Sequence, residues 1–320
     1  MEVRTYAALG DSYSAGEGIS PYLTGTRDGE SRCHRSPYAY SQQLQFEEPP
    51  ATVRFVACSG AVTRDATEGF RVNDTDVLPQ IVHPPDETVD LVTITMGGND
   101  VLFSSIVTHC LLHDDCTNAE FTPPDEPGRA VVTYPPAAPL GRWAIETADL
   151  LAPHLGTLYR DLGTAYPEAR IVVLGYPYLF PSGPAKVSLS DCDTVLRMVS
   201  EKERTRLRDL QDRFNDIIYE EAVDEGVDFV SPVAIWDGHE PCGDRGQYTN
   251  AVKPIVGSPG TFHPNRRGQR AYAALLACYL EATDEPAAKG ERVLLPWEEA
   301  VTSDAPAPGT AARPVPCDGG

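Results

Sequence analysis

Four residues that lie far apart in the chain are of the types that acyl transfer needs: Ser12, Gly60, Asn99 and His263. A serine becomes a nucleophile at neutral pH only when a neighbouring base takes its proton, and histidine, which titrates near that pH, is the usual base. Ser12 and His263 would therefore form the reacting pair. The oxyanion of an attacked carbonyl also needs hydrogen-bond donors. The backbone N–H groups of Ser12 and Gly60 and the side-chain amide of Asn99 are suitable donors.

Three of these residues come directly after apolar runs that predict buried strands. The runs are Val3–Leu9 before Ser12, Thr52–Ala57 before Gly60, and Val89–Met96 before Asn99. Because the carboxyl ends of parallel strands form the ligand crevice at one edge of an open α/β sheet, the three residues are expected side by side there. His263 stands just before a predicted helix over 265–280, which would bring it to the same edge.

Strands and helices alternate along the whole chain. Two further apolar runs, 169–174 and 227–230, bring the predicted strands to five, and stretches with helical spacing of apolar residues separate them. This alternation predicts an α/β fold with a parallel sheet and helices on both faces. The stretch 141–166 has helical spacing, and Pro153 within it predicts a kink or a break.

Length and composition fit a soluble globular protein. The chain has 320 residues, of which 41% are hydrophobic and 23% charged, and no apolar run approaches the roughly 18 residues of a membrane span. A net charge of −21 would repel nucleic acid and anionic bilayers, so neither is an expected partner. We find no internal repeat and no clean linker. We therefore predict one domain over 1–283, a Pro- and Ala-rich tail over 284–320, and a monomer.

No cofactor or metal is expected. No G-x-G-x-x-G follows a predicted strand, Gly10-Asp11-Ser12 lacks the lysine of a phosphate-binding loop, and no C-x-x-C pair occurs. His109 and His113 are spaced like a helical metal pair. However, no glutamate follows His109, and a disulfide explains Cys110 better.

Four blocks of this chain, in the right order, resemble those of the SGNH (GDSL-type) hydrolases. They are Gly10-Asp11-Ser12-Tyr13-Ser14, Gly60, Gly97-Gly98-Asn99-Asp100 and His263-Pro264-Asn265, and the likeness extends from about residue 3 to residue 280. The resemblance implies a flavodoxin-like three-layer α/β/α sandwich with a five-stranded parallel sheet. It also implies Ser12 as the nucleophile and His263 as the base. The implied oxyanion hole consists of Ser12, Gly60 and Asn99.

One position departs from the family pattern. Many members carry an aspartate three residues before the histidine, whereas this chain has Gly260 there. Either a main-chain carbonyl of Gly260 or a neighbour orients His263, which gives a Ser–His dyad, or a carboxylate elsewhere, such as Asp237 or Asp244, completes a triad. Simpler interpretations also stand. Asn99 and His263 could cap the helices that follow them, and Gly60 could be a plain turn.

The eight cysteines predict disulfides, because an even and widely scattered set is typical of an oxidising compartment. The alternative is eight buried free thiols in a cytosolic enzyme. Proximity in the chain suggests Cys33–Cys58, Cys110–Cys116, Cys192–Cys242 and Cys278–Cys317, although the sequence alone leaves the pairing open. Arg35-Ser36 after Cys33, and Cys58 before Gly60, resemble the secreted bacterial esterases and lipases of the family. We therefore expect a secreted, extracellular protein. No signal peptide is visible, which suggests a mature form.

The leading interpretation is a carboxylic-ester hydrolase, an esterase or lipase that acts on small-molecule or lipid esters through an acyl-Ser12 intermediate. A second keeps the chemistry and changes the substrate, giving a phospholipase, a carbohydrate O-acetyl esterase or a serine acyltransferase. A third is a catalytically idle binding module on the same fold. The presence of both Ser12 and His263 argues against the third.

Overall fold

The structure is a computed structural model of the chain. It describes most of the chain up to residue 283, in the ranges 2–72, 74–82, 88–124, 129–183, 199–243, 245–250 and 260–283. The predicted tail over 284–320 lies outside the described residues.

A five-stranded parallel sheet forms the centre of the fold, with the strand order β2–β1–β5–β8–β9. Its strands are β2 (Thr52–Phe55), β1 (Thr5–Ala8), β5 (Leu91–Ile94), β8 (Arg170–Leu174) and β9 (Asp228–Val230). All five fall within the predicted apolar runs. Every residue of β1, β5 and β8 is buried, as expected for inner strands covered on both faces. The predicted fold class is confirmed.

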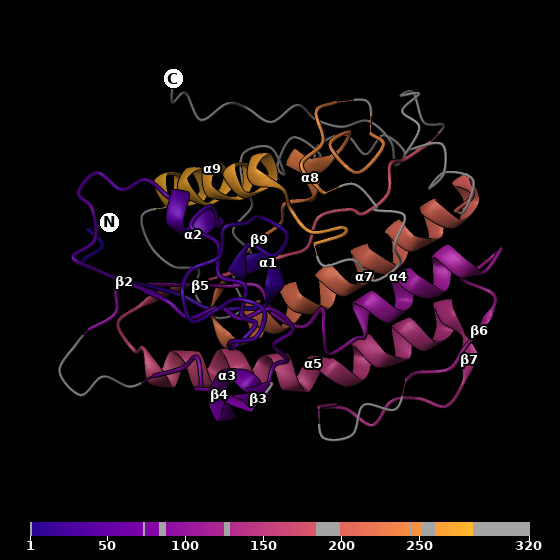
Figure 1. Cartoon of the computed structure of the whole chain (residues 1–320), viewed down its shortest axis with the longest axis horizontal. Helices are drawn as coiled ribbons and strands as arrows, with labels where there is room; N and C mark the ends of the chain where they lie inside the picture. The colour runs from indigo at the N-terminus through magenta and orange to yellow at the C-terminus, as the bar shows by residue number, and fades with distance from the viewer. Residues whose placement is uncertain are drawn as a thin grey trace.

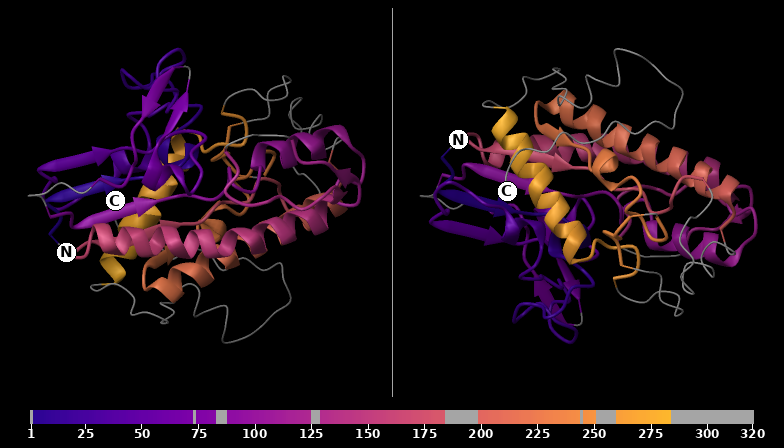
Figure 2. Two further views of the ribbon diagram at one scale, coloured as in Figure 1. Left: turned by 90° about the horizontal axis from the view of Figure 1, so that it is seen from below. Right: turned by 90° about the horizontal axis from the view of Figure 1, so that it is seen from above.

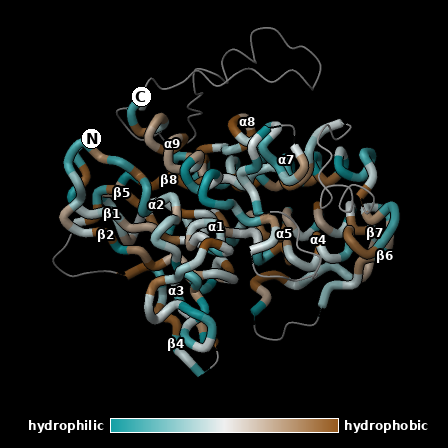
Figure 3. The backbone as a smooth tube through the Cα atoms, turned by 45° about the horizontal axis from the view of Figure 1, so that its top comes forward, coloured by the Kyte–Doolittle hydropathy of each residue, from teal (hydrophilic) through white to brown (hydrophobic). Residues whose placement is uncertain are grey.

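Helices cover both faces of this sheet. On one face α2 (Tyr40–Gln43) packs against α9 (Arg266–Ala282), and on the other α5 (Leu140–Ala165) packs along α7 (Glu201–Glu225), which gives three layers (Figures 1 and 2). Hydrophilic and hydrophobic residues alternate along α9 and α7 (Figure 3). This pattern is typical of amphipathic helices that have one face in a core. Helix α5 continues through Pro153, so a break at this proline is wrong.

Shorter elements decorate the sandwich. They are the helices α1 (Ser12–Ala15), α3 (Asp65–Glu68), α4 (Phe103–Leu112) and α8 (Val233–Trp236), and the hairpins β3 (Phe70–Val72) with β4 (Thr75–Val77) and β6 (Glu120–Phe121) with β7 (Ala138–Pro139). Figure 2 shows that α5 and α7 project well past the end of the sheet, where α4 lies beside them.

Two of the predicted disulfides are confirmed. Cys33–Cys58 joins the long loop after α1 to the end of β2, and Cys110–Cys116 closes the end of α4. Cys242 and Cys278 are also disulfide-bonded, and no described cysteine is free, so the free-thiol alternative is wrong for these residues. The predicted partners Cys192 and Cys317 lie outside the described residues. No helix among the described residues has the length and apolarity to cross a bilayer.

Candidate active site

The turn that carries Ser12 begins where β1 ends. Gly10 has φ +126°, and a Cβ there would fall 2.5 Å from the Ser14 hydroxyl, so only glycine fits. Asp11 is the N-cap of α1, because its carboxylate accepts from the backbone N–H of Tyr13 at 2.9 Å. The N–H of Asp11 donates in turn to the carbonyl of Thr95 at 2.9 Å, beside the end of β5. Ser12 is therefore fixed at the carboxyl edge of the sheet.

Ser12 and His263 meet although 251 positions separate them. The Oγ of Ser12 lies 2.7 Å from Nε2 of His263, and Nδ1 of the same ring lies 3.0 Å from the carbonyl oxygen of Thr261. A carbonyl can only accept, so Nδ1 carries the hydrogen, and the lone pair of Nε2 faces the serine hydroxyl. This is the tautomer that takes a proton from serine.

Several backbone contacts hold the histidine loop. The Tyr13 hydroxyl donates to the carbonyl of Phe262 at 2.9 Å, and the Asn250 N–H donates to the carbonyl of His263 at 2.8 Å. Gly260 has φ +83°, and a Cβ there would approach the Cα of Gly18 more closely than 3.0 Å. No side chain fits at this position. A side chain at position 260 would therefore collide with Gly18, and the carbonyl of the next residue, Thr261, is the group found at Nδ1 of His263.

Of the two aspartates considered from the sequence, the structure describes only Asp237, which has another partner. Asp237 pairs with the guanidinium of Arg208 at 3.0 Å. Asp244 lies outside the described residues. Burial lowers the pKa of His263 from its ordinary 6.5, against the opposing influence of Glu17, the Thr261 carbonyl and Asp11. The ring is consequently neutral at physiological pH, as a base must be.

Gly60 and Asn99 lie on adjacent loops at the same sheet edge. The side-chain nitrogen of Asn99 donates to the carbonyl of Ala61 at 2.9 Å, which orients the amide and leaves its second N–H available. The backbone N–H and the hydroxyl of Thr63 donate to Asp100 at 3.1 and 2.9 Å, which joins the two loops again. Gly60 adopts φ +77°, a left-handed conformation that suits glycine.

The structure also decides two of the simpler interpretations. Leu102 is the N-cap of α4, so Asn99 does not cap that helix. Asn265 caps α9 by accepting from the N–H groups of Arg267 and Gly268, so His263 is not the cap either. The polar groups of Asn99 and His263 are thus not used up by helix termini.

Tyr176 connects three strand ends beneath the site. Its hydroxyl donates to the Asp11 carboxylate at 2.5 Å and accepts from the N–H of Gly98 at 3.1 Å. The residue follows β8, whereas Asp11 and Gly98 follow β1 and β5. The residues around Tyr176 in the chain carry no signal of this role, so sequence reasoning does not identify it.

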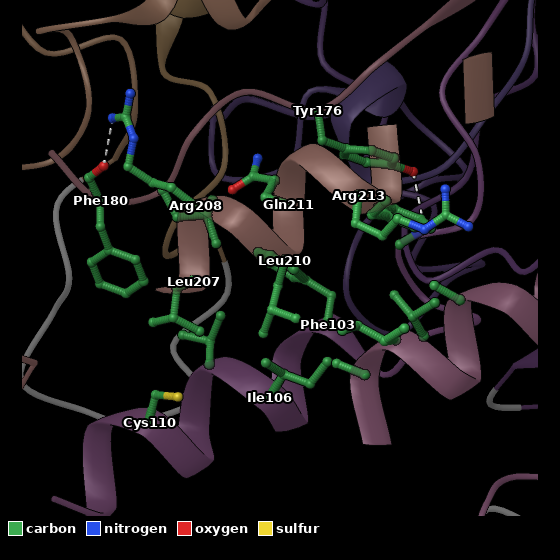
Figure 4. A pocket seen from close by; sticks show the side chains of 18 of the residues that line it. Phe103, Ile106, Cys110, Tyr176, Phe180, Leu207, Arg208, Leu210, Gln211 and Arg213 are labelled. Atoms are coloured by element: carbon green, nitrogen blue, oxygen red, sulfur yellow. Dashed lines mark hydrogen bonds between the residues drawn. The ribbon is translucent and has the colours of Figure 1, made fainter. Parts of the chain in front are cut away.

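An apolar cavity reaches the chain neighbours of two candidate site residues. Tyr13 and Gly98, the chain neighbours of Ser12 and Asn99, line part of it, and the rest lies between α4, α5 and α7. Figure 4 shows Phe103 and Ile106 of α4 facing Leu207 and Leu210 of α7. The cavity measures about 100 Å³, several times the roughly 10–15 Å³ that one buried water needs. It therefore has room for several methylene groups.

Known proteins resemble this chain in fold and in sequence. The crystal structure of phospholipase A1 from Streptomyces albidoflavus is 27% identical and covers 86% of this chain and 98% of its own, with a TM-score of 0.64. That of an extracellular lipase from Streptomyces rimosus is 27% identical, covers 85% and 97%, and has a TM-score of 0.62. Lipase 2 of Streptomyces coelicolor is 30% identical over 84% of this chain and 83% of its own.

Together, the sandwich and these relatives define the class: the protein is a carboxylic-ester hydrolase with an α/β/α fold. Within that class, the chain belongs to the GDSL-like lipase/acylhydrolase family, whose sequence profile matches residues 8–271. The family expected from the four sequence blocks is confirmed.

Proposed function

We propose that Ser12 is the nucleophile and His263 the base of a Ser–His dyad, with the carbonyl of Thr261 as the group that orients the imidazole. The observation that carries this proposal is the 2.7 Å hydrogen bond between Ser12 and His263, combined with the Thr261 contact that fixes the tautomer. No carboxylate is needed to explain the orientation of the ring.

The reaction follows from these positions. His263 takes the proton of the Ser12 hydroxyl while Oγ attacks the ester carbonyl, and the oxyanion is held by the N–H groups of Ser12 and Gly60 and the amide of Asn99. Collapse of the tetrahedral intermediate breaks the bond to the alcohol, which leaves with the proton from His263. Water, deprotonated by the same base, then releases the acid and restores the hydroxyl of Ser12.

The substrate we propose is an ester whose acyl chain is longer than acetyl. The apolar cavity beside Tyr13 and Gly98 supports this, because its space exceeds what a methyl group fills and its walls are mostly hydrocarbon. A carbohydrate O-acetyl esterase would have no use for this volume.

A phospholipid is a second candidate substrate. The relative from Streptomyces albidoflavus is a phospholipase A1. In this chain, a cleft of about 650 Å³ is lined by Gly18, next to the Gly260 turn, and by Arg245, Arg266 and Arg267. Guanidinium groups are suited to a phosphate headgroup. Hydrolysis of phosphatidylcholine that weakens in Arg267→Gln, while hydrolysis of a neutral ester is kept, would support this candidate.

A panel of nitrophenyl esters of graded chain length tests the proposed function. We expect an optimum beyond acetate, loss of turnover in Ser12→Ala, and labelling of Ser12 by a fluorophosphonate. Ser104→Ala, at an exposed serine of α4, is the matched control and is expected to keep full activity. Absence of turnover and of labelling would instead indicate an idle binding module.

We also propose that the protein is secreted, acts as a monomer and carries its activity in residues 1–283. The disulfides and the extracellular lipase of Streptomyces rimosus support secretion. Activity assays on a chain ending at residue 283 test the domain boundary, sedimentation tests the monomer, and fractionation of the producing cells tests secretion.

A further inference from the structure

Glu17 is a buried carboxylate two residues after the nucleophile helix, and only 6% of it is exposed. Its backbone N–H donates to the carbonyl of Ser12 at 3.0 Å. One carboxylate oxygen accepts from the Tyr22 hydroxyl at 3.0 Å and the N–H of Gly18 at 3.2 Å. The mechanism above does not use this group, although a buried acid with so many donors has a fixed position.

The other oxygen of Glu17 joins the two loops that the Cys33–Cys58 disulfide links. It accepts from Nδ1 of His34 and from the hydroxyl of Ser59, both at 2.6 Å. His34 directly follows Cys33, and Ser59 directly follows Cys58 and directly precedes Gly60. The carboxylate of Glu17 therefore accepts from the side chain of the residue that precedes Gly60. The backbone N–H of Glu17 donates to the carbonyl of Ser12.

Glu17 and His34 favour each other's charged form. Burial opposes ionisation, but the hydrogen bonds from His34 and Ser59 lower the pKa of Glu17 to about 2. Burial also opposes the charged form of His34, yet Glu17 and Asp28 raise the pKa of its imidazole above 6.5. The carboxylate thus favours the charged form of the imidazole that it contacts, and this pairing offsets its repulsion of an oxyanion nearby.

Gly60 needs such an anchor. The residue is exposed, nothing lies within 4 Å of its Cβ position, and glycine has wide conformational freedom. The Ala61 N–H donates to the carbonyl of Cys58 at 3.1 Å and closes a turn around Ser59 and Gly60, so the bond from Ser59 to Glu17 ties this turn to the nucleophile loop. On its carbonyl side, the guanidinium of Arg129 donates to the Gly60 oxygen at 2.5 Å. On its amide side, the side-chain contact is the one from Ser59 to Glu17. An oxyanion donor stabilises a transition state only when it is already in position.

We propose that Glu17 is a positioning residue for the oxyanion hole: through Ser59 it holds the amide of Gly60 in register with the turn that bears Ser12. The proposal rests on the proposed function, in which Gly60 is a donor. Glu17 itself touches neither the substrate nor the reacting atoms.

The test compares three single variants on one nitrophenyl ester. Glu17→Gln keeps the shape but replaces the carboxylate that accepts from both Ser59 and His34. We expect kcat to fall roughly 10–50-fold with KM nearly unchanged, less than the roughly 10²–10³-fold loss of a whole donor, because the donor is displaced and not removed. Ser59→Ala cuts the same link from the other end and is expected to lower kcat about 5–20-fold. Glu30→Gln, in the same loop and with a carboxylate that accepts from the N–H of Arg27, is the matched control with an expected change below about twofold.

The double variant Glu17→Gln/Ser59→Ala is decisive, because both changes act on the same hydrogen bond, the one from the Ser59 hydroxyl to residue 17. We expect it to be no slower than the worse single variant. Three results would each overturn the proposal. The first is a double variant whose fold-loss in kcat equals the product of the two single fold-losses. The others are an equal fall in kcat in Glu30→Gln, and a kcat within twofold of the parent in both single variants. Should Glu17→Gln fail to fold, Ser59→Ala alone still gives the kcat result. Activity that survives in Ser12→Ala would instead refute the proposed function.

Discussion

Restoring the family's aspartate at position 260 is expected to damage this enzyme. In Gly260→Asp the new carboxylate would stand three residues before His263, where many relatives of the family carry it. The backbone of Gly18 already occupies that space, since a Cβ at position 260 would come within 3.0 Å of its Cα and lie 3.2 Å from its nitrogen. The turn would have to move before the carboxylate could reach the imidazole.

The magnitude follows from two separable costs. Holding a residue other than glycine at φ +83° costs about 1–2 kcal/mol, and forcing a side chain into a filled space costs about 1–3 kcal/mol more. We therefore expect stability to fall by about 2–5 kcal/mol. Displacement of His263 by about 1 Å would lower kcat/KM roughly 10²-fold.

Urea unfolding and steady-state kinetics on one ester measure the two effects. Gly25→Ala is the matched control, because Gly25 has the same φ of +83° with nothing within 4 Å of its Cβ position, and it is expected to lose only about 1–2 kcal/mol. Gly260→Ala separates the Cβ from the carboxylate. A Gly260→Asp enzyme with parental stability and equal or higher kcat would refute the assignment of Thr261 as the orienting group.

Four other outcomes are expected. Asp237→Asn and Asp244→Asn should each leave kcat within about fivefold, whereas loss of a triad carboxylate costs roughly 10⁴. Asn99→Ala should lower kcat roughly 10²–10³-fold in steady-state assays, as removal of a side-chain oxyanion donor does. The pH profile of kcat/KM should fall on the acid side with a midpoint below 6.5, because burial lowers the pKa of His263 and only the neutral ring accepts the proton. Leu207→Trp should fill the cavity and move the optimum of the ester panel to shorter chains.

Each of these has a contrary result. A loss beyond about 10³ in either aspartate variant would make the dyad untenable. An Asn99→Ala enzyme with unchanged kcat would remove the amide from the oxyanion hole, and an acid limb centred above 6.5 would contradict the effect of burial on His263. A chain-length optimum that is unchanged in Leu207→Trp would mean that the acyl chain does not bind in this cavity.

The sheet was predictable because its signal is local. Runs such as Val89–Met96 are continuously apolar, as strands buried on both faces must be, and β5 lies within that run. Ser12, Gly60 and Asn99 could be singled out from the sequence because each follows the end of a predicted strand. The two disulfides Cys33–Cys58 and Cys110–Cys116 followed from proximity in the chain.

Other features had no local signal. The carbonyl of Thr261 belongs to the backbone, which every residue shares, so no residue type announces it. Glu17 stands in a polar loop, where an isolated acid is indistinguishable from a solvated one until Ser59 and His34 are seen beside it. Pro153 normally ends or kinks a helix, but the packing of α5 on α7 is a tertiary effect that outweighs the local preference.

The projection of α4, α5 and α7 past the sheet separates two tasks within one molecule (Figures 2 and 4). In the proposed function, bond cleavage depends on loops at the strand ends, whereas the hydrocarbon tail of the substrate is held by helix surfaces beyond them. Substitutions at positions such as Ile106 and Leu210 would then change the preferred acyl-chain length of the substrate without moving the reacting atoms.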